Sequence, residues 1–576
     1  PAHRLLASRT ALRRQPGHGL TEYIIIVALI AVAAIGIYTL FGQTIRNQTA
    51  GLALEMSGQD AATAIGNAQT NANTAQTNSN TFEVSIAADV PTGVYEARLV
   101  GRFGASNPRA FVVGRGDEIA EPGGNSSPAA AAEIRLGLTA NGRADANAVD
   151  YYKLKLAAGQ RVLVECAAER IDSRMDGTLA VLDAAGRELA RNRDTDGRDP
   201  LIDFTASSVG EYLVAVHDFL YRGGAEYFYR LTAHAEPRVD FVFPPCGPAG
   251  SNQPYTVYGR NLPGGKPAAG VAVAGTPLES ITVSIPLPAD AANPPNLESA
   301  SLVPPQSALI DAVDYRLGNS NPVRIGIAQA PVVVEQEPAN NDAATAQLVS
   351  VPCEYVGQFY PAGDVDWIEF AATKGQVLGI DVLAHRLGLD SDPCLTLVKV
   401  NPAADGQIAL QEIAAVDDLP ERQALIGSDF DISTDDPSYR FVVPEDAKYR
   451  LMVRDQFGDA RHDARFVYRL RIAPEQPDFR LAAVPQPPRV GQNPNQVPLD
   501  SLVLRRGEAS LIKVIASRRD GFPGEIDITA EGLPTGVTCS GAVIGGDVST
   551  AWLVLSAADD APAAAAAIRI VGRACR

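Results

Sequence analysis

The chain has few of the residues that most often carry out chemistry. Its 576 residues include six histidines, six cysteines, three methionines and two tryptophans. No H-E-x-x-H pair, G-x-S-x-G elbow, P-loop or dinucleotide fingerprint occurs anywhere in it. We therefore expect no enzymatic activity and no resident organic cofactor.

Basic residues are also in short supply. The chain has 49 Lys and Arg against 67 Asp and Glu, which gives a net charge of −18. Affinity for nucleic acid depends on clustered Lys and Arg, so we expect no nucleic-acid partner. An acidic chain is instead suited to solubility and to cation binding at an outer surface.

One long apolar run stands out near the start. Residues 23–41 read Y-I-I-I-V-A-L-I-A-V-A-A-I-G-I-Y-T-L-F, which is long enough to cross a bilayer as a helix. The leader at 1–17 contains four arginines and no acid, so it is expected to stay in the cytoplasm. Glu22 lies at the mouth of the run, where an unpaired carboxylate is costly and therefore suggests a function.

The order of these residues resembles the type IVb pilins of the Flp/Tad kind, over about residues 10–75. The resemblance implies cleavage by a leader peptidase between Gly17 and His18, and a role in assembly for Glu22 and Tyr23. It also implies a precursor in the bacterial inner membrane that later self-assembles into an extracellular, cell-surface filament. An uncleaved signal anchor is the alternative.

After residue 81 the pattern changes to short strands. Stretches such as Tyr151–Leu156 and Arg161–Glu165 alternate apolar and polar residues, and Gly or Pro marks a turn every ten or so residues. The strands repeat: V-D-Y-Y-K-L-K-L at 149–156 returns as V-D-W-I-E-F-A-A at 365–372. Likewise E-Y-L-V-A-V-H-D at 211–218 returns as K-Y-R-L-M-V-R-D at 448–455, which predicts two copies of one sandwich.

These repeats resemble the bacterial pre-peptidase C-terminal (PPC) domain over 120–235 and 336–474. The resemblance implies a small, non-catalytic β-sandwich that in some members binds calcium or matrix polymers. The predicted fold class is a long N-terminal hydrophobic α-helix followed by a multidomain all-β region of PPC-like jelly-roll and immunoglobulin-like (Ig-like) sandwiches. The predicted divisions are a leader (1–17), a pilin-like helix and polar spacer (18–80), a partial Ig-like segment (81–115), a first PPC-like sandwich (116–235), an Ig-like domain (236–333), a second PPC-like sandwich (334–475) and a C-terminal Ig-like domain (476–576).

A calcium loop needs clustered oxygen ligands. The second repeat offers six residues ahead of or at the start of its first long strand: Glu337, Asn340, Asn341, Asp342, Asp364 and Asp366. The first repeat is poorer, since it retains Glu121 and Asn125 but has Ala148 in place of Asp364. Turn chemistry is the alternative explanation, because Asn and Asp stabilise turns through their own side chains.

Six cysteines in an exported chain permit three disulfides. Cys539 and Cys575 flank the last predicted strands, and we expect a bridge between them. The sequence does not pair the other four, which are Cys166, Cys246, Cys353 and Cys394.

Two functions follow from these patterns. In the first, the chain is a structural subunit of a type IV pilus-like filament, with its β-domains displayed outside for adhesion or surface interaction. In the second, it is a membrane-anchored monomer whose β-domains bind a polysaccharide, a matrix polymer or calcium.

Overall fold

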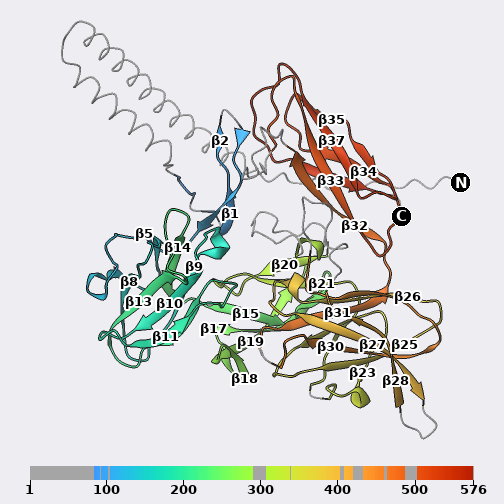
Figure 1. The fold of residues 1–576 in the computed structure, drawn as a ribbon, viewed down its shortest axis with the longest axis horizontal. Coiled ribbons are helices and arrows are strands. Elements are labelled where there is room, and N and C mark those ends of the chain that lie inside the picture. Colours follow the sequence, from blue (N-terminus) through green and yellow to red (C-terminus); the bar gives the residue numbers. More distant parts are fainter. Residues whose placement is uncertain are drawn as a thin grey trace, which may run out of the picture. The chain divides into compact units, whose positions relative to one another are not determined.

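The computed structural model describes residues 84–574 apart from the gaps at 88, 91, 102–103, 290–306, 338, 403–407, 419–432, 460–462 and 487–501. This part of the chain divides into two compact units, each described here by itself. The described strands of the smaller unit are β2 (Val100–Gly101) and β3 (Gly104–Ala105), which pair as a short hairpin. The larger unit comprises Pro91–Arg98 and Asn107–Arg576 and contains all the remaining described strands (Figure 1).

The predicted fold class is wrong in its leading element. The described residues form β-strands and five short 3₁₀ turns, with no α-helix among them. Nor does this part of the chain contain a helix with the length and apolarity to cross a bilayer, so the predicted insertion in the inner membrane is corrected. The predicted helix itself, at 18–80, lies outside the described residues. The five 3₁₀ turns are η1 (Pro128–Ala130), η2 (Glu169–Ile171), η3 (Ser307–Leu309), η4 (Ala343–Thr345) and η5 (His385–Leu387).

Residues 118–234, called copy one below, form two facing five-stranded sheets. One sheet has the order β11-β10-β13-β8-β6 and the other β12-β9-β14-β7-β5. The strands are β5 (Glu118–Ala120), β6 (Ala132–Ile134), β7 (Leu138–Arg143), β8 (Asp150–Leu156), β9 (Arg161–Ala167), β10 (Gly177–Leu182), β11 (Glu188–Asn192), β12 (Leu201–Thr205), β13 (Gly210–Asp218) and β14 (Phe228–His234).

Residues 332–474, called copy two, repeat this topology strand for strand. The two sheets have the orders β28-β27-β30-β25-β23 and β29-β26-β31-β24-β22. The strands are β22 (Val332–Val334), β23 (Gln347–Leu348), β24 (Cys353–Gln358), β25 (Asp366–Ala372), β26 (Val377–Leu383), β27 (Pro393–Pro402), β28 (Ile408–Val416), β29 (Ser438–Val442), β30 (Ala447–Asp455) and β31 (Val467–Pro474).

Two smaller sandwiches and one two-stranded sheet complete the larger unit. The middle sandwich has sheets β15-β17-β19-β18 and β16-β21-β20, and the C-terminal one has sheets β32-β33-β37-β35 and β36-β34-β38. Strands β1 (Gly93–Ala97) and β4 (Arg109–Val113) pair with each other. The other strands are β15 (Arg238–Phe243), β16 (Cys246–Pro248), β17 (Asn252–Arg260), β18 (Lys266–Val273), β19 (Thr276–Pro286), β20 (Ala312–Tyr315), β21 (Val323–Ala328), β32 (Asp478–Gln486), β33 (Ala509–Arg519), β34 (Ile526–Glu531), β35 (Val537–Cys539), β36 (Ala542–Ile544), β37 (Thr550–Ala557) and β38 (Arg569–Arg573).

Alternation along the strands produces one apolar core in each copy. In β8, Asp150, Tyr152, Leu154 and Leu156 are buried while the residues between them are more exposed, which is the period of two expected of a strand. The corresponding strand of copy two, β25, buries Ile368 and Phe370 in the same way. Burial of a large apolar side chain contributes roughly 1.5–3 kcal/mol, so each core is large enough to stabilise its own copy.

Candidate metal centre

Acidic side chains from two segments of copy two meet at the start of β25. Glu335 and Glu337 follow the edge strand β22, whereas Asp366 is the first residue of β25. β22 pairs in parallel with β24, so the residues that follow β22 lie beside the C-terminal end of β24. There the backbone N–H of Gln358 donates to the Glu335 carboxylate at 3.0 Å. Carboxylate oxygens of Glu335, Glu337 and Asp366 lie within 4.8 Å of one another. Asp364 belongs to the same group, because the negative charges of Asp366 and Glu337 act on its carboxyl group.

Neutral polar groups hold the buried side of this cluster. The Asn340 side chain is completely buried, and its amide nitrogen donates to Asp366 and, at 3.0 Å, to the Tyr355 hydroxyl. The Tyr468 hydroxyl donates to the other oxygen of Asp366 at 2.6 Å. The backbone N–H of Trp367 donates to the carbonyl oxygen of Asn340 at 2.8 Å, which ties the loop after β22 to β25.

The cluster contains four carboxyl groups and little to neutralise them. Burial, and then the charge of Asp366, raise the pKa of Glu335 and that of Asp364 to about 9. Burial also raises the pKa of Asp366 to about 7, although its hydrogen bond from Tyr468 acts in the opposite direction. Carboxyl groups that crowd together away from water cannot all be charged unless a cation joins them.

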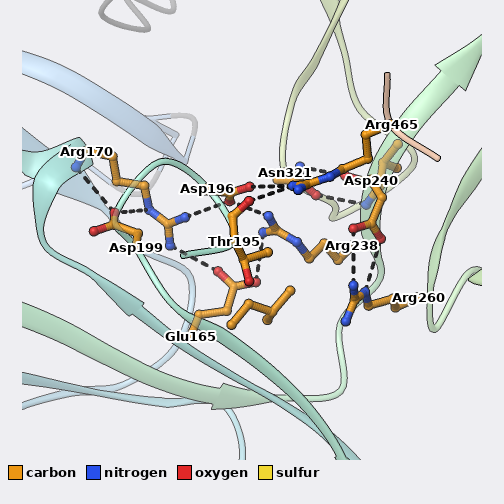
Figure 2. Close-up of polar contacts among 12 residues, drawn as sticks. Glu165, Arg170, Thr195, Asp196, Asp199, Arg238, Asp240, Arg260, Asn321 and Arg465 are labelled. Carbon is orange, nitrogen blue, oxygen red and sulfur yellow. Dashed lines mark hydrogen bonds and ion pairs between the residues drawn. The ribbon is translucent and has the colours of Figure 1, made fainter. Parts of the chain in front are cut away.

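Elsewhere the same chain buries acids together with arginines. Figure 2 shows Glu165 and Asp196 among arginine side chains of the larger unit. Arg238 donates to Glu165 at 3.1 Å and also to Asp196, and Arg170 reaches each of these carboxylates at 3.1 Å. Burial alone would raise the pKa of Glu165, but Arg238 and its other partners hold that pKa well below the ordinary value. The copy-two cluster therefore differs from the cluster around Glu165 in having no arginine among its described contacts that could balance its carboxyl groups.

Two buried oxygen atoms in the cluster have no hydrogen-bond partner among the described residues. They are Oδ1 of Asn340 and Oδ2 of Asp364. Buried polar atoms in native proteins nearly always have a partner, so both atoms are available to a ligand. Carboxylate and amide oxygens are the donors that calcium prefers, and the residues present therefore fit a calcium ion.

The structure brings together four of the six residues that the sequence offered, namely Glu337, Asn340, Asp364 and Asp366. Asn341 supports them, since its amide donates to Asp364 at 3.2 Å. Asp342 does not join them: its side chain accepts from the backbone N–H of Ala344 at 2.8 Å and caps the turn η4.

Sequence reasoning missed Glu335. Its signal lies in the repeat: Glu335 directly follows β22 as Glu121 directly follows β5 in copy one. The backbone N–H groups of Glu121 and Glu335 donate to Asn141 and Val356, which occupy matching positions of β7 and β24. The structural counterpart of Glu121 is thus Glu335, and Glu337 has none.

A second acidic group of copy two consists of Asp392, Asp417 and Asp418. The side chains of Asp417 and Asp418 are exposed to solvent, where carboxylates gather without an ion, and Gln456 donates to Asp417 at 3.2 Å. We assign no ligand to this group.

The remaining predicted residues fall elsewhere. Gly17, His18, Glu22 and Tyr23, proposed for processing and assembly, lie outside the described residues, as does Cys575. Its predicted partner Cys539 is half-buried, and no disulfide occurs in the described part of the chain. Cys166, Cys246 and Cys353 are free and buried, and Cys394 is free and half-buried.

No family model and no curated protein matches the chain. Solved structures that resemble parts of it include the pre-peptidase C-terminal domain of a collagenase from Bacillus anthracis, with 19% identity over 18% of this chain and 93% of that one at a TM-score of 0.16. The surface-associated copper-binding protein CorA of Methylomicrobium album BG8 matches with 12% identity over 25% and 98%, at a TM-score of 0.15. The N-terminal CBM22 tandem domain of Xyn10C from Paenibacillus barcinonensis matches with 8% identity over 58% and 85%, at 0.14.

These neighbours include a PPC domain and a carbohydrate-binding β-sandwich tandem. With TM-scores this low, the sandwich fold of each copy is taken from the chain's own sheets. The comparisons give the pilin resemblance no support, and the described residues contain no spanning helix. The pilin assignment is therefore corrected, and the filament function has no support from these findings.

Proposed function

We propose that this protein is a non-catalytic binding protein built from β-sandwich modules, and that copy two takes up one calcium ion. The observation that carries the proposal is the convergence of Glu335, Glu337, Asp364 and Asp366 with the unpartnered oxygen of Asn340. Among the described residues, no arginine or lysine is a main electrostatic neighbour of Asp364 or Asp366, which leaves a charge that a divalent cation would supply.

Calcium fits this donor set better than a transition metal. All the converging donors are oxygen atoms, whereas zinc and copper sites are built mainly from imidazole and thiolate. Calcium also accepts six to eight oxygen ligands in irregular geometry, including carboxylates and amides, which suits donors from a loop and a strand end. The ion would tie the loop after β22 to β25 and so stabilise copy two.

Calcium-dependent stability tests this proposal directly. In full-length protein freed of metal with a chelator, added calcium should raise the melting temperature of copy two. At a concentration 100-fold above Kd, such binding contributes about 2.7 kcal/mol. Asp364→Asn should abolish the effect, and Asp342→Asn is the matched control, because Asp342 caps a turn and Asn caps turns equally well. An unchanged melting temperature of the parent protein in millimolar calcium would rule out the site.

A surface-binding role is supported by one face of the C-terminal sandwich. Leu511 on β33 lies directly opposite Val554 on β37, and Trp552 lies two residues before Val554 on the same strand. The side chains of Leu511 and Trp552 are 42% and 48% exposed, while Leu553 and Leu555 point into the core. A tryptophan left exposed beside aliphatic residues is typical of a contact surface.

We propose a polysaccharide or matrix polymer as the ligand of this face. Co-sedimentation with insoluble polysaccharides and with matrix proteins, in calcium and in chelator, measures the binding. Trp552→Ala should reduce the fraction of protein that sediments with the polymer severalfold. Leu348→Ala, which removes an exposed apolar side chain of copy two, should leave that fraction unchanged. If the two variants sediment with the polymer to the same extent, this face is not the binding surface.

A further inference from the structure

Copy one has a polar cluster at the position of the calcium site of copy two. This cluster, called the copy-one cradle below, consists of Glu121, Asp150 and Tyr229. Glu121 follows β5 and accepts from the backbone N–H of Arg143 at 2.9 Å, as Glu335 accepts from Gln358. Asp150 is the first residue of β8, as Asp366 is of β25. The Tyr229 hydroxyl donates to Asp150 at 2.9 Å, in the place where Tyr468 donates to Asp366.

The cradle of copy one has lost half of its carboxyl groups. Ala148 stands where copy two has Asp364. Asn125, the counterpart of Asn340, follows four positions after Glu121, whereas Asn340 follows five positions after Glu335, and copy one has no equivalent of Glu337. Too few oxygen donors remain for a calcium ion, which takes six to eight.

A second tyrosine adds to the polar contacts of the copy-one cradle. The Tyr152 hydroxyl lies 2.8 Å from that of Tyr229, and both side chains are almost completely buried. The Tyr229 hydroxyl also lies 3.4 Å from a carboxylate oxygen of Glu121. The Tyr229 hydroxyl thus contacts a carboxyl oxygen of both Glu121 and Asp150. A hydroxyl has a single proton to donate, so one further proton on the carboxyl pair completes these contacts.

We propose that copy one holds a proton shared by Glu121 and Asp150 in the position where copy two holds its cation. The chain therefore binds one calcium ion, not two, and only copy two responds to calcium. Copy one responds to acid alone. The proton in copy one does not depend on the proposed function. The count of one calcium ion per chain rests on the proposed function.

The groups that face Asp150 support a proton at this position. Burial, and then the charge of Glu121, raise the pKa of Asp150 to about 7, against the opposing hydrogen bond from Tyr229. Asp145, in the loop between β7 and β8, raises it further. Behind them, Tyr152 lies close to the Cys166 thiol of β9, and burial raises the pKa of both groups.

The sign of the pH effect follows from this shift. Asp150 binds its proton more tightly in the folded chain than in the unfolded one, where the pKa of an aspartate is about 4. Its contribution to stability is therefore fully present in acid and is lost as the pH rises through about 7. Between pH 6 and pH 8 a single group of this kind lowers the folding equilibrium constant about tenfold.

Hydrogen exchange of the full-length protein tests both repeats in one experiment. The protection factors of β8 and β25 are measured at pH 6 and pH 8, with and without calcium, and corrected for the intrinsic exchange rate. In calcium-free protein, protection of β8 should fall about tenfold between the two pH values. Calcium should increase the protection of β25 and leave that of β8 unchanged.

The same substitution at equivalent positions separates the two effects. Asp150→Asn should abolish the pH dependence of β8 and leave the calcium response of β25 intact. Asp366→Asn should do the reverse. Asparagine keeps the size of the side chain and an oxygen that accepts from Tyr229, and Glu121→Gln serves as a second variant should the first fail to fold.

Three results would overturn the inference: calcium protection of β8, two calcium ions per chain by calorimetry, or a pH dependence of β8 that persists in Asp150→Asn. If calcium fails to protect β25 while β8 keeps its pH dependence, the proposed calcium function fails and the shared proton stands. The two ideas are thereby tested separately.

Discussion

The hydroxyl of Tyr468 donates a 2.6 Å hydrogen bond to Asp366 at the bottom of the acidic cluster. Both side chains are completely buried, so neither can turn to water for another partner. This bond orients the carboxylate of Asp366, whose other oxygen accepts from Asn340.

Removal of that hydroxyl should weaken both folding and calcium binding. Tyr468→Phe leaves one oxygen of a buried carboxylate without its donor, which costs about 1–3 kcal/mol. We expect a lower midpoint of urea unfolding for copy two and a weaker calcium affinity by calorimetry. Tyr439→Phe is the matched control, because Tyr439 packs at the edge of the same core and is half-buried. Equal effects of the two substitutions would mean that the Tyr468 bond does not organise the site.

Calcium affinity should depend steeply on pH. The pKa values of Glu335 and Asp364 are raised to about 9 and that of Asp366 to about 7, so the cluster holds protons at neutral pH in the absence of metal. Calcium binds carboxylates, not carboxylic acids, and must displace these protons. The apparent affinity should therefore rise from pH 6 to pH 9. Titration calorimetry in buffers of different ionisation enthalpy should show net proton release, and an affinity that is flat over this range would contradict the cluster's raised pKa values.

The substitution Gly357→Ala should displace two side chains of the proposed calcium site. A Cβ atom at this position of β24 would lie 2.6 Å from a Glu335 carboxylate oxygen and 2.6 Å from the Tyr468 hydroxyl. Both groups would have to move, so Gly357→Ala should reduce calcium affinity more than tenfold and lower the melting temperature. Gly210→Ala is the control, since its Cβ would meet nothing within 4 Å. Calcium titrations of the two variants should differ accordingly, and parent-like binding by Gly357→Ala would place the ion elsewhere.

The sequence predicted those features that depend on local pattern. Alternation in 150–156 marked a strand, and the recurrence of V-D at 149–150 and 365–366 aligned the two repeats, which identified Asp366 and the loss of Asp364 in copy one. Glu335 could not be recognised in this way, because its role depends on the parallel pairing of β22 with β24. Asp342 is an acidic residue in the same loop as Asn340, so the sequence could not separate it from the cluster. Its side chain turns away and caps η4, which only the structure shows. The predicted N-terminal helix rested on the apolar run at 23–41 and on the residues that flank it, all of which lie outside the described part of the chain.

The arginine-rich cluster of Figure 2 should be far more sensitive to charge removal than any surface ion pair. Arg238 is buried and contacts both Glu165 and Asp196, whose pKa values it helps to hold down. Its loss leaves two half-buried carboxylates with reduced compensation, so the cost should fall below the roughly 3–5 kcal/mol of a fully buried pair.

We therefore expect Arg238→Ala to unfold at markedly lower urea concentration than the parent, and to recover part of the difference at acid pH. The recovery follows because Glu165 and Asp196 can take up protons once the arginine that lowers their pKa values is gone. Arg191→Ala, which breaks an exposed pair with Glu188, should unfold like the parent at every pH. A loss of stability in Arg238→Ala that is the same at pH 5 and pH 8 would show that packing of the arginine side chain, not its charge, stabilises this cluster.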